Sequence, residues 1–211
     1  MEDFILILEL IGTCAFALSG AAAAIDARLD IFGVFFCGVI TALGGGVFRD
    51  ILLGNLPPAM FCRYIYLITA LCSSLAVFLF ARYCRRIFVE RAALLASLNN
   101  VFDAVGLGVF TVVGISTAIA AGYGDNDFFV IFLGVATGCG GGILRDITLN
   151  RIPLILSKRI YAVASLLGGG LYFVLQTTAC PQWLAVCGSI ALIFVLRILA
   201  AVFRWDLPKA F

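Results

Sequence analysis

The stretch GGGVFRDI at residues 44–51 occurs a second time, 96 residues later, as GGGILRDI at residues 140–147. Six of the eight positions are identical, and the other two stay apolar. Over residues 38–63 the same shift gives twelve identities in 26 positions, including Thr41/Thr137, Pro57/Pro153 and Arg63/Arg159. The sequence therefore contains an internal repeat, and the fold must place the two copies in related positions.

The composition is that of a membrane protein. Hydrophobic residues make up 64% of the 211 residues and charged residues only 12%, with a mean hydropathy of +1.15. Soluble domains carry roughly 25% charged residues, so this chain has too little charge to cover a surface that faces water. A transmembrane helix needs about 20 apolar residues, which leaves room for seven spans with short loops.

Seven apolar stretches are long enough to be helices rather than transmembrane strands, which need only about ten alternating residues. They lie near residues 4–25, 32–54, 64–83, 92–121, 128–149, 160–178 and 182–204. The sequence predicts an all-α membrane protein with one membrane domain over residues 1–211.

Each repeat holds three of these spans. Because three is an odd number, the second copy must enter the membrane upside down, as in many transport proteins. We expect the first repeat at residues 1–90 and the inverted second repeat at 91–178. Residues 179–211 then form a seventh helix, outside the symmetry, and a C-terminal tail.

Basic residues predict the orientation. With the N-terminus outside, twelve of the fourteen Lys and Arg fall on inner segments, and only Arg49 and Arg63 fall on outer ones. Cytoplasmic segments carry the excess of positive charge, so the C-terminus is expected in the cytoplasm of a plasma (inner) membrane protein. The inner residues are Arg28, Arg82, Arg85, Arg86, Arg91, Arg145, Arg151, Lys158, Arg159, Arg197, Arg204 and Lys209.

The glycine triplets Gly44, Gly45, Gly46 and Gly140, Gly141, Gly142 weaken the second and fifth spans, since each helical glycine costs about 1 kcal/mol against alanine. A kink or a short unwound stretch would free backbone carbonyls, which membranes tolerate only beside water or a site. The alternative is close packing of helices. We favour a pore lined at the triplets, because Arg-Asp follows both of them. A third triplet at 168–170 lacks Arg-Asp and is interpreted as packing.

The pairs Arg49-Asp50 and Arg145-Asp146 place ionisable groups inside the predicted spans. Such groups are costly in a bilayer and are usually paired or face water. Adjacent residues point about 100° apart on a helix, so each arginine is expected to pair with another group. The arginines either control a cation path, with the carboxylates offsetting their charge, or tie the helices together.

Other polar residues are weaker candidates. Asp103 either caps the fourth helix or faces an aqueous path, and we favour the path. Thr41 and Thr137 lie one turn before their glycines, where hydroxyls could replace water around an ion, although threonine in membrane helices more often bonds its own backbone. Asp26, Arg28 and Asp30 could form a cation vestibule, but we favour a solvated loop. The basic cluster at 82–91 is interpreted as a topology signal, with binding of anionic lipids as the alternative.

Several classes are excluded or disfavoured. The chain has no histidine, so histidine-based catalysis and histidine-ligated metal sites are excluded. Its eight cysteines form no CxxC pair and lie mostly in apolar runs, where cysteine packs as a small hydrophobe. The net charge is only +2, and the sequence has no clustered basic face of the kind that nucleic-acid-binding proteins carry. We expect no enzyme, cofactor or fixed metal site.

The doubled Gly-Gly-Gly-x-x-Arg-Asp motif within a layout of three, three and one spans resembles the prokaryotic branch of the trimeric intracellular cation (TRIC) channels. The resemblance covers residues 1–205. It implies a homotrimer in which each protomer holds a pore lined by the second and fifth helices, bent at the glycine triplets and flanked by Arg49, Asp50, Arg145 and Asp146. It also implies potassium as the main permeant ion, with sodium as a second candidate. The Lys-Glu-Val signature of the animal members is absent.

We therefore predict a potassium-permeable channel in the lipid bilayer. Inverted repeats also serve secondary transporters, and small repeat proteins of this kind have been labelled glycine transporters, so transport of glycine or another small solute is the alternative. An intramembrane enzyme is a weak rival, since only scattered carboxylates and thiols are available for catalysis.

Overall fold

The computed structural model describes residues 2–84, 90–157, 160–178 and 180–205, and these ranges contain helices and no strand. The long helices are α1 (Glu2–Asp26), α2 (Ile31–Leu52), α4 (Tyr64–Tyr83), α6 (Ala92–Ala118), α7 (Asp127–Thr148), α9 (Tyr161–Gln176) and α10 (Gln182–Phe203). A π-helical turn, η1 (Ile119–Tyr123), extends α6, and short helices α3 (Ala59–Cys62) and α8 (Leu154–Ser157) follow α2 and α7. The expected basic residues Arg85, Arg86, Lys158, Arg159 and Lys209 lie outside the described residues.

Seven long helices form at the seven predicted apolar stretches. Within the described residues, six of them are long and apolar enough to cross a membrane. The exception is α9, whose 16 residues fall short of the about 20 that a full span needs. Large apolar side chains point outward, such as Phe32 and Phe128 with exposed fractions of 74% and 81%. Such a surface suits lipid as the solvent.

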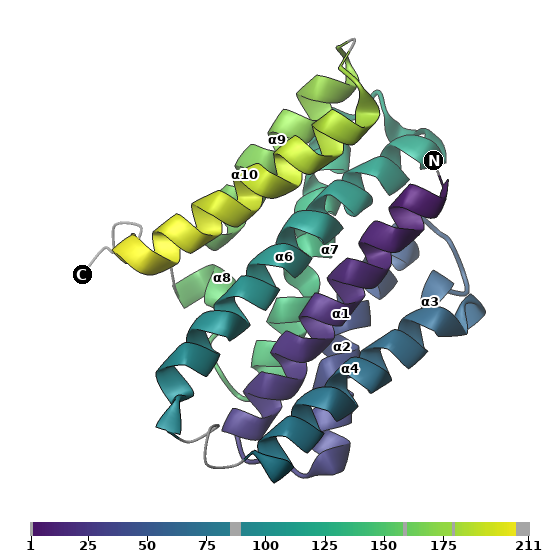
Figure 1. Ribbon diagram of the computed structural model, residues 1–211. Helices are drawn as coiled ribbons and strands as arrows, with labels where there is room; N and C mark the ends of the chain where they lie inside the picture. Colours follow the sequence, from purple (N-terminus) through teal and green to yellow (C-terminus); the bar gives the residue numbers. More distant parts are fainter. Residues whose placement is uncertain (1, 85–89, 158–159, 179, 206–211) are drawn as a thin grey trace.

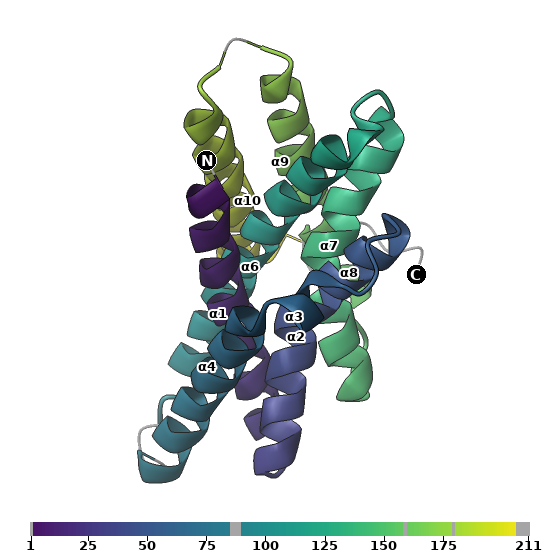
Figure 2. The same cartoon turned by 90° about the vertical axis from the view of Figure 1, so that its right-hand side faces the viewer.

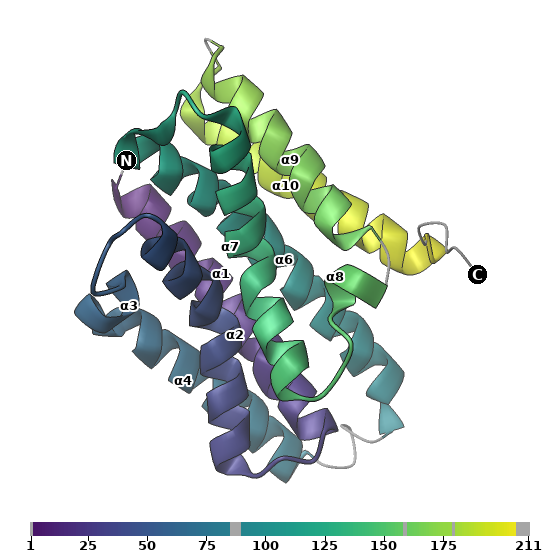
Figure 3. The same cartoon turned by 180° about the vertical axis from the view of Figure 1, so that it is seen from behind.

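The helices form two related groups of three, with α10 added. α1 packs on α6 and α2 packs on α7, so equivalent helices of the two repeats meet at the centre (Figures 1 and 3). α4 flanks α1 and α2, and α9 flanks α6 and α7 in the same way. α10 lies beside α9 and α6, on the side away from α4 (Figure 2). The fold therefore consists of two inverted three-helix repeats and one extra helix, as predicted.

An aromatic stack marks the contact of α1 with α6. The rings of Phe16 and Phe110 lie with their centroids 5.4 Å apart. A Cβ on Gly106 would overlap the Phe16 ring, so this glycine lets the ring lie against the α6 backbone. The two phenylalanines are 94 residues apart and occupy equivalent places in their repeats, which puts this stack close to the pseudo-two-fold axis.

The glycine triplets lie where α2 meets α7. A Cβ on Gly45 would overlap the carbonyl oxygen of Thr137, and one on Gly141 would overlap the carbonyl oxygen of Thr41. Both helices continue through their triplets without interruption, so the unwound stretch that the sequence allowed is not observed. Close packing, which we ranked below the pore, explains the middle glycine of each triplet because small residues let two backbones approach.

The third glycine of the first triplet differs from the second. No atom lies within 4 Å of a Cβ placed on Gly46. In the triplet at 168–170, a Cβ on Gly168 would overlap Ile193 of α10, which confirms packing for that residue, whereas Gly170 faces open space. Glycines within one triplet therefore differ in whether a side chain would fit.

We predict that Gly45→Ala lowers the free energy of unfolding by about 1–3 kcal/mol, the usual cost of overpacking, because the methyl group would meet a backbone carbonyl that cannot move aside. Gly46→Ala, its neighbour, should be neutral or slightly stabilising, since alanine is the better helix former. Thermal unfolding of the purified variants in detergent measures both. Equal stability of the two variants would contradict the assigned contact.

Candidate functional site

Two buried arginines lie at equivalent places near the C-terminal ends of α2 and α7. Arg49 and Arg145 have exposed fractions of 7% and 3%. Each falls in the last turn of its helix, where the helix dipole favours a positive charge. A buried charge also needs partners, because taking it out of water costs several kcal/mol. The partners of these two arginines define the candidate site.

The adjacent aspartate binds each arginine. Arg49 Nε donates to Asp50 Oδ1 at 2.8 Å, and Arg145 Nε donates to Asp146 Oδ1 at the same distance. Adjacent residues on a helix point apart, so pairing of each arginine with its neighbouring aspartate was not expected. The arginine side chain is long enough to fold back and reach the next residue. The arginines also bind other groups, as expected.

The second oxygen of each aspartate fixes the chain that follows. Asp50 Oδ2 accepts a hydrogen bond from the backbone N–H of Ala59, the first residue of α3, at 2.9 Å. Asp146 Oδ2 accepts one from Leu154, the first residue of α8, at 2.9 Å. Each Arg-Asp pair thus ties the end of a central helix to a short helix, which the sequence did not predict.

A carboxylate from the first helix of each repeat completes the pair. Arg145 Nη1 lies 2.8 Å from Asp103 Oδ1 of α6 and donates to the Ser19 hydroxyl of α1 at 2.8 Å. Arg49 Nη1 lies 3.8 Å from Glu9 Oε1 of α1. Asp103 is 1% exposed and lies mid-helix, twelve residues into α6, so the capping alternative was wrong.

A tyrosine from the third helix of each repeat lies beside this carboxylate. Tyr66 donates its hydroxyl to Glu9 Oε2 at 2.5 Å. Its equivalent, Tyr161, is buried near Asp103 and Gly142, but its hydroxyl has no hydrogen-bond partner among the described residues. The two repeats share the positions of these groups and differ in how they are bonded.

The second site has one more cation. Arg197 of α10 places Nη2 3.5 Å from Asp103 Oδ2, and its guanidinium lies over the Tyr161 ring at 4.4 Å from the centroid. Arg197 is 5% exposed, although its position near the C-terminus predicts a cytoplasmic basic residue. Hereafter the Glu9 cluster is Glu9, Arg49, Asp50 and Tyr66, and the Asp103 cluster is Asp103, Arg145, Asp146, Tyr161 and Arg197.

The two threonines bond their own helices. Thr41 donates to the carbonyl of Cys37 at 2.5 Å, and Thr137 donates to that of Leu133 at 2.6 Å. Both side chains are buried against glycines of the neighbouring helix, Gly20 for Thr41 and Gly114 for Thr137. Their hydroxyl protons are thus occupied, and neither residue lines the cavities described next.

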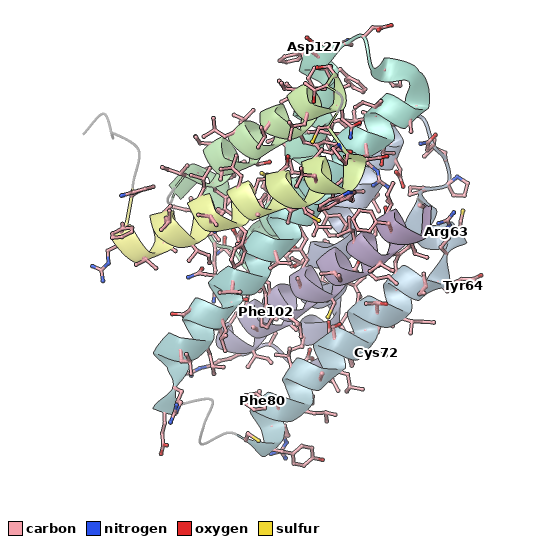
Figure 4. All side chains as sticks on the ribbon, turned by 45° about the horizontal axis from the view of Figure 1, so that its top comes forward. Arg63, Tyr64, Cys72, Phe80, Phe102 and Asp127 are labelled. Atoms are coloured by element: carbon pink, nitrogen blue, oxygen red, sulfur yellow. The ribbon has the colours of Figure 1, made fainter. Side chains whose placement is uncertain are left out.

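A cavity adjoins each cluster, and the two cavities lie toward opposite ends of α1. The larger, about 1050 Å³, adjoins the Asp103 cluster, and Arg145, Asp146 and Arg197 line it. Phe80 and Phe102 also line it, and Figure 4 shows Phe80 at the far end of α4 from Arg63 and Tyr64. The smaller, about 40 Å³, is lined by Gly46 and all four residues of the Glu9 cluster.

The loop acids have local roles. Asp30 caps α2 by accepting a hydrogen bond from Gly33 N at 2.8 Å. Asp26 lies 3.9 Å from Arg151 at an exposed position beside the larger cavity. The structure thus fits the expected solvated loop. Among the described residues, no group of three or more carboxylates or cysteines is arranged to hold a metal ion.

Sequence reasoning missed Glu9, Tyr66, Tyr161 and the role of Arg197. The glycine motif repeats at a shift of 96, whereas α1 and α6 correspond at a shift of 94. That shift aligns Gly12, Phe16 and Gly20 with Gly106, Phe110 and Gly114, and it also aligns Glu9 with Asp103. The equivalence of Glu9 and Asp103 is therefore visible in the sequence, but only at the shift of the first helices.

Comparison with known proteins agrees with the duplicated architecture. A family model described as "Glycine transporter" matches residues 6–82 and again residues 100–177, once in each repeat. The chain is 37% identical over 207 residues to the UPF0126 membrane protein YvgT of Bacillus subtilis, covering 96% of this chain and 95% of that one. It is 36% identical over 200 residues to the UPF0126 inner membrane protein YadS of Escherichia coli K12, covering 95% and 92%.

Solved structures with the same fold are channels rather than enzymes. One, from a study of conductance through TRIC cation channels, has a TM-score of 0.83 at 38% identity, covering 97% of this chain and 96% of that one. A prokaryotic TRIC channel in 0.5 M KCl has a TM-score of 0.87 at 34% identity, covering 98% and 100%. The TRIC orthologue of Rhodobacter sphaeroides has a TM-score of 0.86 at 31% identity, covering 96% and 99%. By its duplicated sequence and by its fold, this multi-pass membrane protein belongs to the prokaryotic branch of the TRIC family.

Proposed function

We propose that the chain is a monovalent cation channel, permeable to potassium and with sodium as a second candidate ion. It works as a homotrimer in which each protomer holds its own pore between α2 and α7. The observation that carries the proposal is the pair of buried clusters, each with two carboxylates and each beside a cavity, on the two sides of the glycine contact. Inside a bilayer, such ionisable groups mark ion paths.

The path would run from the cavity at the Glu9 cluster to the cavity at the Asp103 cluster. Gly46 lines the first, and Gly142 lies beside Tyr161 and Asp103 of the second cluster. Between them lie the Gly45–Gly141 contact and the stacked rings of Phe16 and Phe110. Conduction therefore requires α2 and α7 to bend at their triplets and move apart.

The arginines would control this movement. Arg49 and Arg145 are fixed positive charges beside the path, and each is bonded to the last turn of its own helix and to the first helix of its repeat. Opening shifts an arginine-containing half-helix so that the charge leaves the path.

Orientation and location follow from the distribution of charge. The excess of Lys and Arg on inner segments supports an N-terminus outside and a C-terminus in the cytoplasm of the plasma (inner) membrane. The larger cavity, with Arg28 and Arg151 at its rim, then opens toward the cytoplasm, and the Glu9 cluster lies toward the outside. The trimer and the permeant cation are supported by the likeness to TRIC channels of known structure.

Single-channel recording of the purified protein in a planar bilayer with unequal KCl tests the proposal. We expect discrete current steps that reverse near the potassium equilibrium potential, because carboxylates on both sides of the contact favour cations. A bilayer that stays silent after verified insertion of the protein would reject a channel.

We predict that Arg145→Ala, and separately Arg49→Ala, changes unitary conductance or open probability by at least about twofold, since one fixed charge beside a confined path alters the local cation concentration. Arg82→Ala is the matched control, because Arg82 is exposed at the end of α4 and lines neither cavity. Wild-type currents from both arginine variants would contradict a role for these residues in permeation.

The alternative is a secondary transporter of glycine or another small solute, the activity after which the matching family model is described. Proteoliposomes separate the two functions, because a transporter coupled to an ion gradient accumulates solute whereas a channel only dissipates gradients. We expect potassium flux down its gradient and no accumulation of labelled glycine under an imposed sodium or proton gradient. Accumulation above the external concentration would establish the transporter instead.

A further inference from the structure

The seventh helix removes the symmetry of the two clusters. α10 follows the second repeat, and it packs on α6 and α9. There it places Arg197 against Asp103 from the side opposite to Arg145, so that each carboxylate oxygen faces one arginine. In the described part of the chain, Glu9 has an ion pair with Arg49 only.

Formal charge differs between the clusters as a result. The Glu9 cluster has two carboxylates and one arginine, a net charge of −1. The Asp103 cluster has two carboxylates and two arginines, a net charge of zero. Without Arg197 the two repeats would carry the same charge at equivalent places.

A fixed charge in a confined site with low-dielectric walls changes the local concentration of counter-ions. Cations are therefore concentrated at the Glu9 cluster and not at the Asp103 cluster. Exposed charges lie near both clusters: Arg28, Arg151 and Asp26 at the larger cavity, and Arg63 beside Tyr66 of the Glu9 cluster. Solvent and salt screen these exposed charges more than the buried ones. Cation current should then be larger from the Glu9 side than from the Asp103 side.

We propose that Arg197 makes cation flow through this protein depend on direction. It does so by neutralising the carboxylate of Asp103. The inference rests on the proposed channel function and adds a residue from outside the repeats to it. If Arg197 had a purely structural role, the current would depend on whether the Arg197–Asp103 ion pair is present. It would not depend on the net charge of the Asp103 cluster.

Four channels of different charge separate these roles. Their Asp103 clusters carry +1 in Asp103→Asn, zero in the wild type, −1 in Arg197→Gln, and zero again in the double variant, which has lost the ion pair but regained the wild-type charge. The matched control is Arg204→Gln, which removes the same charge from the exposed end of the same helix.

The measurement is the ratio of single-channel currents at equal voltages of opposite sign in symmetric 0.1 M KCl. We expect a change of roughly twofold in this ratio, toward unity in Arg197→Gln and away from unity in Asp103→Asn. The double variant and Arg204→Gln should keep the wild-type ratio. In 1 M KCl, where the Debye length is about 3 Å, the differences should shrink.

Each outcome decides between the roles. A ratio in Arg197→Gln equal to that of the wild type overturns the inference, and so does a double variant that behaves like Arg197→Gln. Arg197→Lys, which keeps the charge, should keep the ratio. If Arg197→Gln fails to fold, Asp103→Asn carries the test, and a wild-type ratio in that variant overturns the inference. A conducting wild type with unchanged variants leaves the channel function intact, whereas a silent wild type rejects both.

Discussion

The buried pairing of Arg49 and Arg145 with carboxylates is the constraint on which the rest of the structure depends. An arginine in a membrane helix is tolerated only when it is paired or reaches water. Here each arginine binds the next residue and a carboxylate from the first helix of its repeat. In each repeat, these bonds therefore hold the central helix (α2 or α7) against the first helix and the short helix that follows. The same arrangement occurs at both ends of the molecule.

The glycine contact between α2 and α7 works together with these pairs. At Gly45 and Gly141 the two backbones approach so closely that no Cβ fits. These two glycines lower the helix propensity of α2 and α7 but allow the two helices to make a tight contact. A charged cluster lies on either side of this contact. In the proposed channel this contact is the barrier, and the Glu9 cluster, with its net charge of −1, is the place where cations gather.

The repeats are equivalent in architecture and unequal in electrostatics. Tyr66 bonds its carboxylate, whereas Tyr161 instead lies under the guanidinium of Arg197. The difference comes from α10, which belongs to neither repeat. An added helix can thus give a direction to a molecule whose duplicated core has none, because it needs to contribute only one charge to one of two equivalent sites.

The sequence by itself determined the membrane solvent, the seven helices, the inverted repeat and the importance of Gly-Gly-Gly-x-x-Arg-Asp, because hydropathy, helix length and an odd number of spans are properties read along the chain. Only the tertiary structure decided the partners. Asp103 was expected as a cap or a pore residue and is bonded to two arginines, and Glu9 and Arg197 were not recognised as parts of the clusters. Pairing across helices depends on how far each side chain reaches in space, and the two-residue offset between α1 and α6 hid the correspondence from a single alignment shift.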